Sequence, residues 1–321
     1  MSSPTRRWIR GAIAALALVS AACGPGGSLS NSETYKPPPP LALVVLVDPS
    51  TPQMADELRQ LQDVIRTTST PGESVVVMAL QPSFGQAFTV RKGDNLSAIA
   101  AAHGVSLAAL EAANPQLGPL SGRDWKLIYS GERVMIPNGA SGAALLLVSK
   151  APAGPPPPQL IRLPQLSSNP TEYQRAQYER KSAADRATND ARIAAWRAGA
   201  DKAIEPWRQQ VLAELERRTG SPVLGARAPD AAMLSATLTA GLTTLSGLPG
   251  RRLLLVIGGG DMGPGALAPR SLVDVNLVVA NLADANAAAA WTTAATNAGA
   301  KSVSALDQAL TRLELAQVIN R

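Results

Sequence analysis

Three oxygen-bearing side chains, Asp48, Ser50 and Asp261, could together hold a hard divalent cation. Asp48 and Ser50 follow an apolar run at residues 41–47, and Asp261 follows a second run at 252–257. Both runs predict buried β-strands, and ligands of open α/β sheets bind beyond the carboxyl ends of such strands. We expect a metal-free scaffold in which Asp48 caps the following helix. The alternative is a Mg²⁺ ion held by these oxygens partly through waters.

Other reactive chemistries find little support in this sequence. His103 is the only histidine and Cys23 the only cysteine, too few for a zinc hydrolase or a Cys–His nucleophile pair. A G-x-G-x-x-G pattern spans Gly258, Gly260 and Gly263, but prolines follow where a dinucleotide fingerprint needs a helix. No pair of carboxylates stands out as the acid and base of a glycosidase. We therefore expect no catalytic activity.

The segment at residues 88–137 has the pattern of a small self-contained unit. A β-prone run at residues 88–90 leads into a Gly-Asp-Asn turn at 93–95, and apolar residues at helical spacing follow. A second β run occupies residues 133–136. This order predicts a strand, two helices and a second strand.

These residues resemble a LysM domain, which we place at residues 87–138. The motif T-V-x-x-G-D-x-L-x-x-I-A is matched from Thr89, and G-V-S-x-x-x-L-x-x-x-N-P from Gly104. The closing I-Y-x-G-x-x-x-x-I-P is matched from Ile128, with Ser130 where the family usually has proline. The match runs the full length of the motif.

The resemblance implies binding of N-acetylglucosamine-containing glycans, chiefly peptidoglycan and sometimes chitin, in a shallow groove. Such recognition uses backbone and amide hydrogen bonds beside an apolar floor. Carried over to this sequence, one wall of the groove is Gly93, Asp94, Asn95 and Leu96, and the other is Leu127, Ile128 and Tyr129. The alternative is a LysM fold that has lost ligand binding and mediates only protein contacts.

Residues 1–22 have the pattern of a secretory signal peptide. Three arginines precede a small and apolar run at residues 11–19, which is too short for a stable membrane span. The segment ends at Cys23 in a sequence that resembles a bacterial lipobox, although Ser20 stands where leucine is commoner. The resemblance implies export across the cytoplasmic membrane and acylation of Cys23, which would anchor the protein at the cell envelope. Ordinary secretion is the alternative.

Residues 23–40 begin with this cysteine and end in four consecutive prolines. We interpret them as a tether that is first flexible and then stiff. The formal charge of the chain is +6, and the three signal arginines account for half of it. The remaining charge is too weak and dispersed for a nucleic-acid partner.

Outside the LysM segment, apolar strand patterns alternate with helical patterns. Strands are expected at residues 41–47, 74–80, 143–149, 252–257 and 275–280, and helices at 53–67, 231–245, 285–297 and 304–320. This alternation predicts a doubly wound, mostly parallel sheet formed by residues 41–86 and 139–321. If strands 74–80 and 143–149 pair antiparallel, the LysM module is an insertion that projects from the sheet edge.

This order of elements is similar to a von Willebrand factor A domain. The family's metal site uses D-x-S-x-S with a distant Thr and Asp. Asp48 and Ser50 match, Pro52 replaces the second serine, Asp261 could be the distant acid, and no threonine fits. The resemblance implies a degenerate metal-dependent crevice able to bind an acidic residue of an envelope protein partner.

Residues 171–218 are expected to form a helical excursion from this α/β domain. From residue 193 apolar positions recur at helical spacing, whereas residues 172–192 are almost entirely polar. We expect the second half to pack on the sheet, with Pro206 opening a new helix or kinking this one. The first half is either a plain excursion or a partner-binding arm.

Together these features predict a non-catalytic lipoprotein of the cell envelope. It would bind peptidoglycan, or another N-acetylglucosamine glycan, through the LysM module and link the membrane to the wall. One alternative is a protein-interaction adaptor that uses the crevice at Asp48. Another is a wall-remodelling enzyme with a carboxylate site that the sequence does not mark.

Overall fold

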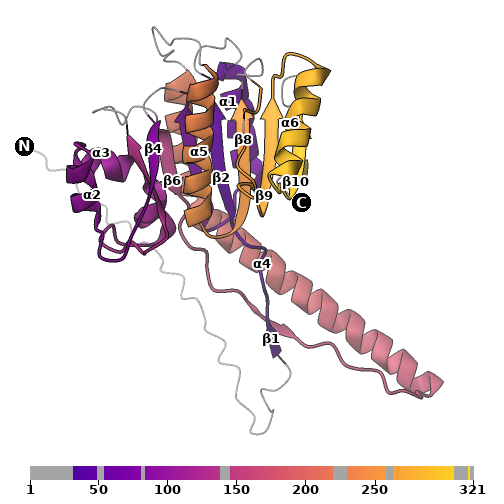
Figure 1. Cartoon of the computed structure of the whole chain (residues 1–321). Helices are drawn as coiled ribbons and strands as arrows, with labels where there is room; N and C mark the ends of the chain where they lie inside the picture. The colour runs from indigo at the N-terminus through magenta and orange to yellow at the C-terminus, as the bar shows by residue number, and fades with distance from the viewer. Residues whose placement is uncertain are drawn as a thin grey trace, which may run out of the picture.

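A mostly parallel sheet lies at the centre of the computed structural model (Figure 1). The structure describes residues 32–48, 54–80, 84–137, 145–219, 230–257, 263–265, 267–306 and 317–318. The sheet has the order β10-β9-β8-β2-β3-β6, and only the edge strand β6 is antiparallel to its neighbour. Its strands are β2 (Leu41–Val47), β3 (Ser74–Ala79), β6 (Leu145–Lys150), β8 (Arg251–Ile257), β9 (Val275–Ala280) and β10 (Ser302–Ala305).

Helices cover both faces of this sheet. Residues of β2 alternate between two hydrophobic clusters, so Leu43 and Leu46 belong to opposite faces. One face packs against α1 (Met54–Thr68) and the C-terminal half of α4 (Glu172–Thr219). The other packs against α5 (Ala231–Gly247) and α6 (Ala285–Asn297), which begin at the N-caps Asp230 and Asp284. The predicted mixed α/β architecture with a mostly parallel sheet is confirmed.

One predicted helix is wrong at its start. Residues 304 and 305, expected to open a helix at 304–320, belong to β10, which pairs parallel with β9. The β-branched Val303 packs against the cluster on the α6 face, and this burial overrides the helical pattern. Residues 317–318 are helical, and the rest of the expected helix after Leu306 lies outside the described residues.

A small second unit lies between β3 and β6 in the sequence and beside α5 in space (Figure 1). Its elements are β4 (Phe84–Thr89), α2 (Leu96–Ala102), α3 (Leu107–Ala112), the 3-10 turns η2 (Pro115–Leu117) and η3 (Pro119–Ser121), and β5 (Arg133–Pro137). β4 and β5 pair antiparallel, as do β3 and β6 on either side of the unit, so the condition under which the sequence makes this unit an insertion is met. Leu120 and Met135 of this unit are buried in the core on the α5 face.

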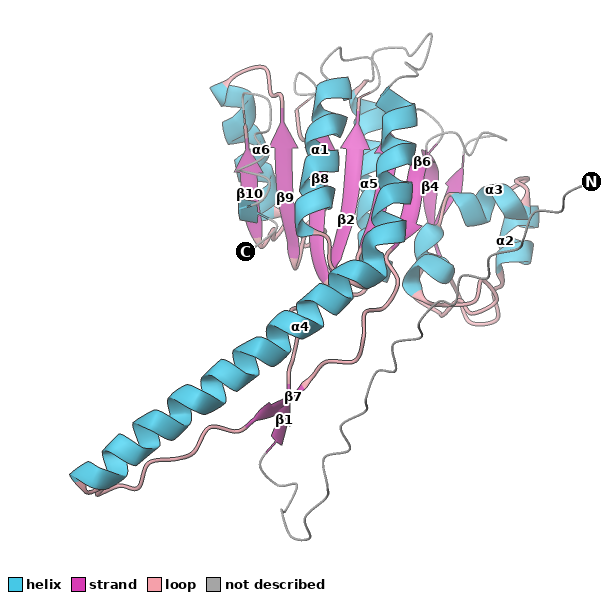
Figure 2. Cartoon of the chain, turned by 180° about the vertical axis from the view of Figure 1, so that it is seen from behind, coloured by secondary structure: helices cyan, strands magenta, loops and turns pink. Residues whose placement is uncertain are grey.

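Helix α4 continues well beyond the sheet and forms an arm (Figures 1 and 2). Its 48 residues correspond to a length of about 72 Å. Ile204, Trp207 and Val211 pack on the sheet, as expected for the second half. Pro206 lies inside this packed stretch and does not open a new helix, because burial of its neighbours outweighs the one backbone hydrogen bond that proline removes. Within the described residues, no helix is both long and apolar enough to span a membrane.

An extended segment runs back along the projecting half of α4. The Trp196 indole N–H donates to the Pro155 carbonyl at 2.9 Å, and Asn189 exchanges two hydrogen bonds of 2.8 Å with the backbone of Ile161. Ile161 belongs to β7 (Gln159–Ile161), which pairs antiparallel with β1 (Ser32–Thr34). The polar half of the helix is therefore part of a three-element arm.

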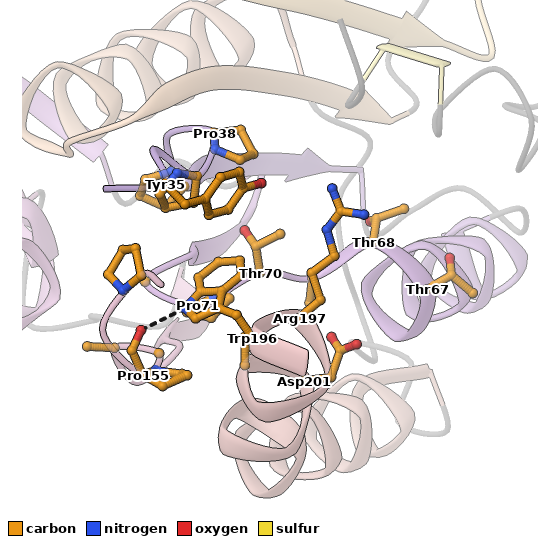
Figure 3. Close-up of a pocket in the computed structure, with 18 residues that line it drawn as sticks. Tyr35, Pro38, Thr67, Thr68, Thr70, Pro71, Pro155, Trp196, Arg197 and Asp201 are labelled. Atoms are coloured by element: carbon orange, nitrogen blue, oxygen red, sulfur yellow. Dashed lines mark hydrogen bonds between the residues drawn. The ribbon is translucent and has the colours of Figure 1, made fainter. Parts of the chain in front are cut away.

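Residues 32–40, the second half of the expected tether, are fastened to this arm. The Tyr35 N–H donates to the Pro158 carbonyl at 2.9 Å, and the Tyr35 ring meets the Trp196 ring edge-on, 5.4 Å between centroids. Tyr35, Pro38 and Trp196 together line a pocket of about 780 Å³ (Figure 3). These contacts hold residues 32–40 against the folded protein, and their interpretation as the stiff part of a tether stays a prediction. Residues 23–31 lie outside the described residues.

Candidate glycan-binding site

The first wall of the predicted groove is a tight turn that leads into α2. Gly93 has a φ of 94°, a conformation that favours glycine. Asp94 closes the turn because its Oδ2 accepts the Arg91 N–H at 2.7 Å. Asn95 is the N-cap of α2, and its Oδ1 accepts the Ala98 N–H at 2.8 Å. Both polar side chains thus shape the backbone of this wall.

The second wall is a loop held by an ion pair. Arg123 donates two hydrogen bonds to the carboxylate of Glu132, at 2.5 and 3.1 Å, and a third to the Leu127 carbonyl. The same carboxylate accepts the Tyr129 N–H at 2.8 Å. The Arg123 guanidinium carbon also lies 4.8 Å from the centre of the Tyr129 ring. One side-chain pair therefore positions the backbone at Leu127 and Tyr129.

The ion pair also shifts the titration of its members. Partial burial by itself would raise the pKa of Glu132, but hydrogen bonds from Arg123 and the Tyr129 N–H outweigh it and lower that pKa. The hydrogen bond to Glu132 raises the pKa of Arg123. Both groups are therefore charged at neutral pH, and the loop is held by a charge-assisted, bidentate contact.

The two walls lie at the same end of the β4–β5 pair. The Val90 N–H donates to the Glu132 carbonyl, and the Gly131 N–H donates to the Val90 carbonyl, both at 2.8 Å. These bonds place the turn after Val90 beside the loop before Arg133. Leu96 from the first wall and Ile128 from the second pack in one hydrophobic cluster. The fold thus brings the two predicted sets of site residues together.

Apolar surface is available beside these backbone groups. Leu127 is 51% exposed and Tyr129 is 58% exposed, so both side chains offer apolar surface to a ligand. Leu96 is buried and supports the turn from below. An exposed aromatic and aliphatic pair next to a rigid, polar backbone turn suits a sugar that carries an acetamido group.

Asn114 supports this unit from within and was missed by the sequence reasoning. It is fully buried, donates to the carbonyls of Leu110 and Met135, and accepts the Met135 N–H at 2.7 Å. Its side chain therefore gives Met135 the partners that another strand would supply. The Asn-Pro pair at the end of the second helical motif was the available signal. Arg123 and Glu132 were also missed, since nine positions separate them and no motif links them.

The second predicted site is only partly described. Asp48 is buried at the carboxyl end of β2, and its N–H donates to the Ile257 carbonyl of β8 at 2.9 Å. Residues 49–53, between Asp48 and the described part of α1, lie outside the described residues, so a cap by Asp48 stays a prediction. Ser50, Asp261 and the proposed lipidation site Cys23 lie outside the described residues. Across the described ranges, no three His, Cys, Asp or Glu side chains group as metal ligands.

Residues 84–137 thus form a small module of βααβ form, with an exposed apolar pair beside two rigid backbone turns. Residues 88–137 match the family model described as LysM domain, and this segment is a LysM domain. LysM domains generally bind N-acetylglucosamine glycans of the peptidoglycan and chitin type. Searches of curated proteins and of solved structures gave no match to the chain.

Proposed function

We propose that this protein is a non-catalytic lipoprotein of the bacterial cell envelope that binds peptidoglycan and links the membrane to the wall. The LysM match carries the glycan part of the proposal. One hydrophobic cluster joins the two groove walls, and the Arg123–Glu132 ion pair holds the second wall. The exposed Leu127 and Tyr129 supply an apolar floor that a folded domain would otherwise bury.

Membrane anchoring through Cys23 would place the arm nearest the membrane. Cys23 lies nine residues before Ser32, the first residue of β1 on the arm. Nine residues span at most about 31 Å when fully extended. Pairing of β1 with β7 on the arm therefore supports an arrangement in which the arm holds the LysM domain away from the lipid surface.

Binding to purified sacculi tests the glycan part of the proposal. Lipid-free protein with Cys23→Ser should pellet saturably with sacculi, and the double variant Leu127→Ala, Tyr129→Ala should lose most of this binding. Tyr173→Ala is the matched control, because Tyr173 is similarly exposed but lies on the arm. Equal binding by all three proteins would refute the groove, and no binding by any would refute peptidoglycan as the ligand.

Metabolic labelling with an alkyne fatty acid tests the anchor. The full chain expressed in a bacterial host should incorporate label and fractionate with membranes, and Cys23→Ala should abolish both. Release of unlabelled full-length product into the soluble fraction would support ordinary secretion instead.

A second candidate function uses the crevice at the carboxyl end of β2. The chain order of the strands reverses between β2 and β8, and Asp48 lies at this switch point, where α/β proteins bind ligands. The strand order is compatible with the von Willebrand factor A-like resemblance, which implies capture of a partner's acidic residue through Mg²⁺. Titration calorimetry with Mg²⁺ should give heat that Asp48→Ala removes, and the absence of such heat would refute this candidate.

A further inference from the structure

A pocket of about 590 Å³ lies between the LysM domain and the edge strand β6. The LysM side contributes Glu111, Leu120 and Trp125, and β6 contributes Val148, Ser149 and Lys150. Its volume is in the range of small-ligand sites. It is not the glycan groove, because none of the predicted groove residues lines it.

One tight turn connects this pocket to the glycan groove. The Leu127 N–H donates to the Asp124 carbonyl at 2.9 Å, so the residues between them form the turn. Trp125 of this turn lines the pocket, while Leu127 at its end belongs to the groove. The Trp125 ring is held against Gly118, where an added Cβ would lie 2.3 Å from it. A ligand that fills the groove therefore passes close to the pocket.

One edge of strand β6, which lines this pocket, has no partner strand among the described residues. The Ala151 N–H donates at 2.7 Å to the carbonyl of Glu73, the residue directly before β3, so the backbone N–H of Ala151 faces β3. In an antiparallel pair this orientation alternates, so Ser149 also faces β3 while Val148 and Lys150 face away. Within the described ranges β6 is the last strand of the sheet. The outward backbone groups of Val148 and Lys150 are therefore a template for one added strand.

The side chains around this edge of β6 suit a short peptide that carries both a negative and a positive charge. Lys150 reaches across to the LysM domain, since a Cβ added at Gly122 would lie 3.7 Å from its Nζ. Glu111 lies on the LysM side of the same pocket. An ammonium and a carboxylate beside an edge strand can bind a peptide's carboxylate and amine, while Trp125 and the half-exposed Val148 contact its apolar part.

We propose that this pocket binds the peptide stem of the peptidoglycan strand whose sugars occupy the LysM groove, by strand addition to β6. The inference rests on the proposed glycan function. Stem peptides of peptidoglycan are short and carry carboxylates and, in many walls, a free amine. The insertion of the LysM domain beside β6 thus builds a joint site that an isolated LysM domain lacks.

The test compares two ligands, soluble glycan strands that carry stem peptides and the same strands stripped of them by an amidase. Lipid-free full chain should bind the stem-bearing strands about tenfold more tightly or better, as two or three net hydrogen bonds imply. Val148→Pro removes one outward N–H that β3 does not use, and should abolish this preference without weakening binding of stripped strands. Val148→Thr keeps the N–H and the side-chain shape, and should retain the preference.

Lys150→Gln should reduce the preference severalfold and leave binding of stripped strands unchanged. Equal affinity of the unaltered protein for both ligands would overturn the proposal, as would a preference that survives Val148→Pro and Lys150→Gln. Unchanged binding of stripped strands by each variant shows that its LysM domain is folded. If the unaltered protein bound neither strand, the proposed function would fail, and calorimetry with free stem tetrapeptide would then decide this inference separately.

Discussion

Replacing Asn114 by alanine should destabilise the LysM domain more than any other single polar substitution in it. Three buried backbone groups would lose their side-chain partner, namely the N–H and C=O of Met135 and the C=O of Leu110. An unsatisfied buried group costs about 1–3 kcal/mol, and the costs of three groups in one network do not add in full, so the expected loss is about 3–6 kcal/mol. Water cannot replace the amide, because Asn114, Met135 and Leu110 are each no more than 1% exposed.

Asn189 on the arm offers a matched control. It brackets the backbone N–H and C=O of Ile161 with two hydrogen bonds of 2.8 Å, the same arrangement that Asn114 makes with Met135. Asn189 and Ile161 are only partly buried, so water can take over these bonds. Asn189→Ala should therefore cost less than about 1 kcal/mol locally.

Native-state hydrogen exchange is the suitable assay, because a chain with several structural units does not unfold in one transition. Amides of α3 and β5 should lose about 3–6 kcal/mol of protection in Asn114→Ala, and those of α4 should change little in either variant. A loss below about 1 kcal/mol in Asn114→Ala, or losses of equal size in the two variants, would refute the argument from burial.

Three further predictions concern charge and packing. Because the pKa of Glu132 is lowered in the folded state, its contribution to stability is present above pH 4.5 and is lost as pH falls through the lowered pKa. Glu132→Gln should remove this loss of stability at acid pH, measured as the urea midpoint of unfolding at a series of pH values. The same variant should bind sacculi more weakly. Burial raises the pKa of Glu73 to about 7, against the opposing effects of the Thr70 N–H, Arg251 and Arg208, so the folded state binds the extra proton between pH 4.5 and 7. Stability should therefore fall as pH rises through this window, by up to about 3 kcal/mol, and Glu73→Gln should flatten the profile; a flat profile in the unaltered protein would contradict this. Gly118→Ala would place a methyl group 2.3 Å from the Trp125 ring. The free energy of unfolding should therefore fall by about 1–3 kcal/mol, and the tryptophan fluorescence emission should shift. An unchanged emission spectrum would show that the ring moves freely.

Much of the fold was predictable because its signals are local. The strand β2 is a continuous apolar run that is buried on both faces, and β8 and β9 follow the same rule. The antiparallel pairing of β3 with β6 was the condition under which the sequence makes the LysM segment an insertion, and the structure has this pairing. The predicted start of the last helix was wrong, because residues 304 and 305 belong to the edge strand β10. Their pairing with β9 outweighs the local helical spacing of apolar residues.

The sequence by itself determined the LysM domain, since its motif is contiguous and each turn, cap and apolar position lies near its partners in the chain. It also determined the mostly parallel sheet through its apolar runs. Only the tertiary structure decided the contacts between distant residues: the Arg123–Glu132 pair, the Asn114 bridge to Met135, and the fastening of Tyr35 to Trp196. It also placed Trp125 opposite the outward edge of β6. Such contacts depend on the three-dimensional path of the backbone, for which residue types and their spacing carry no local signal.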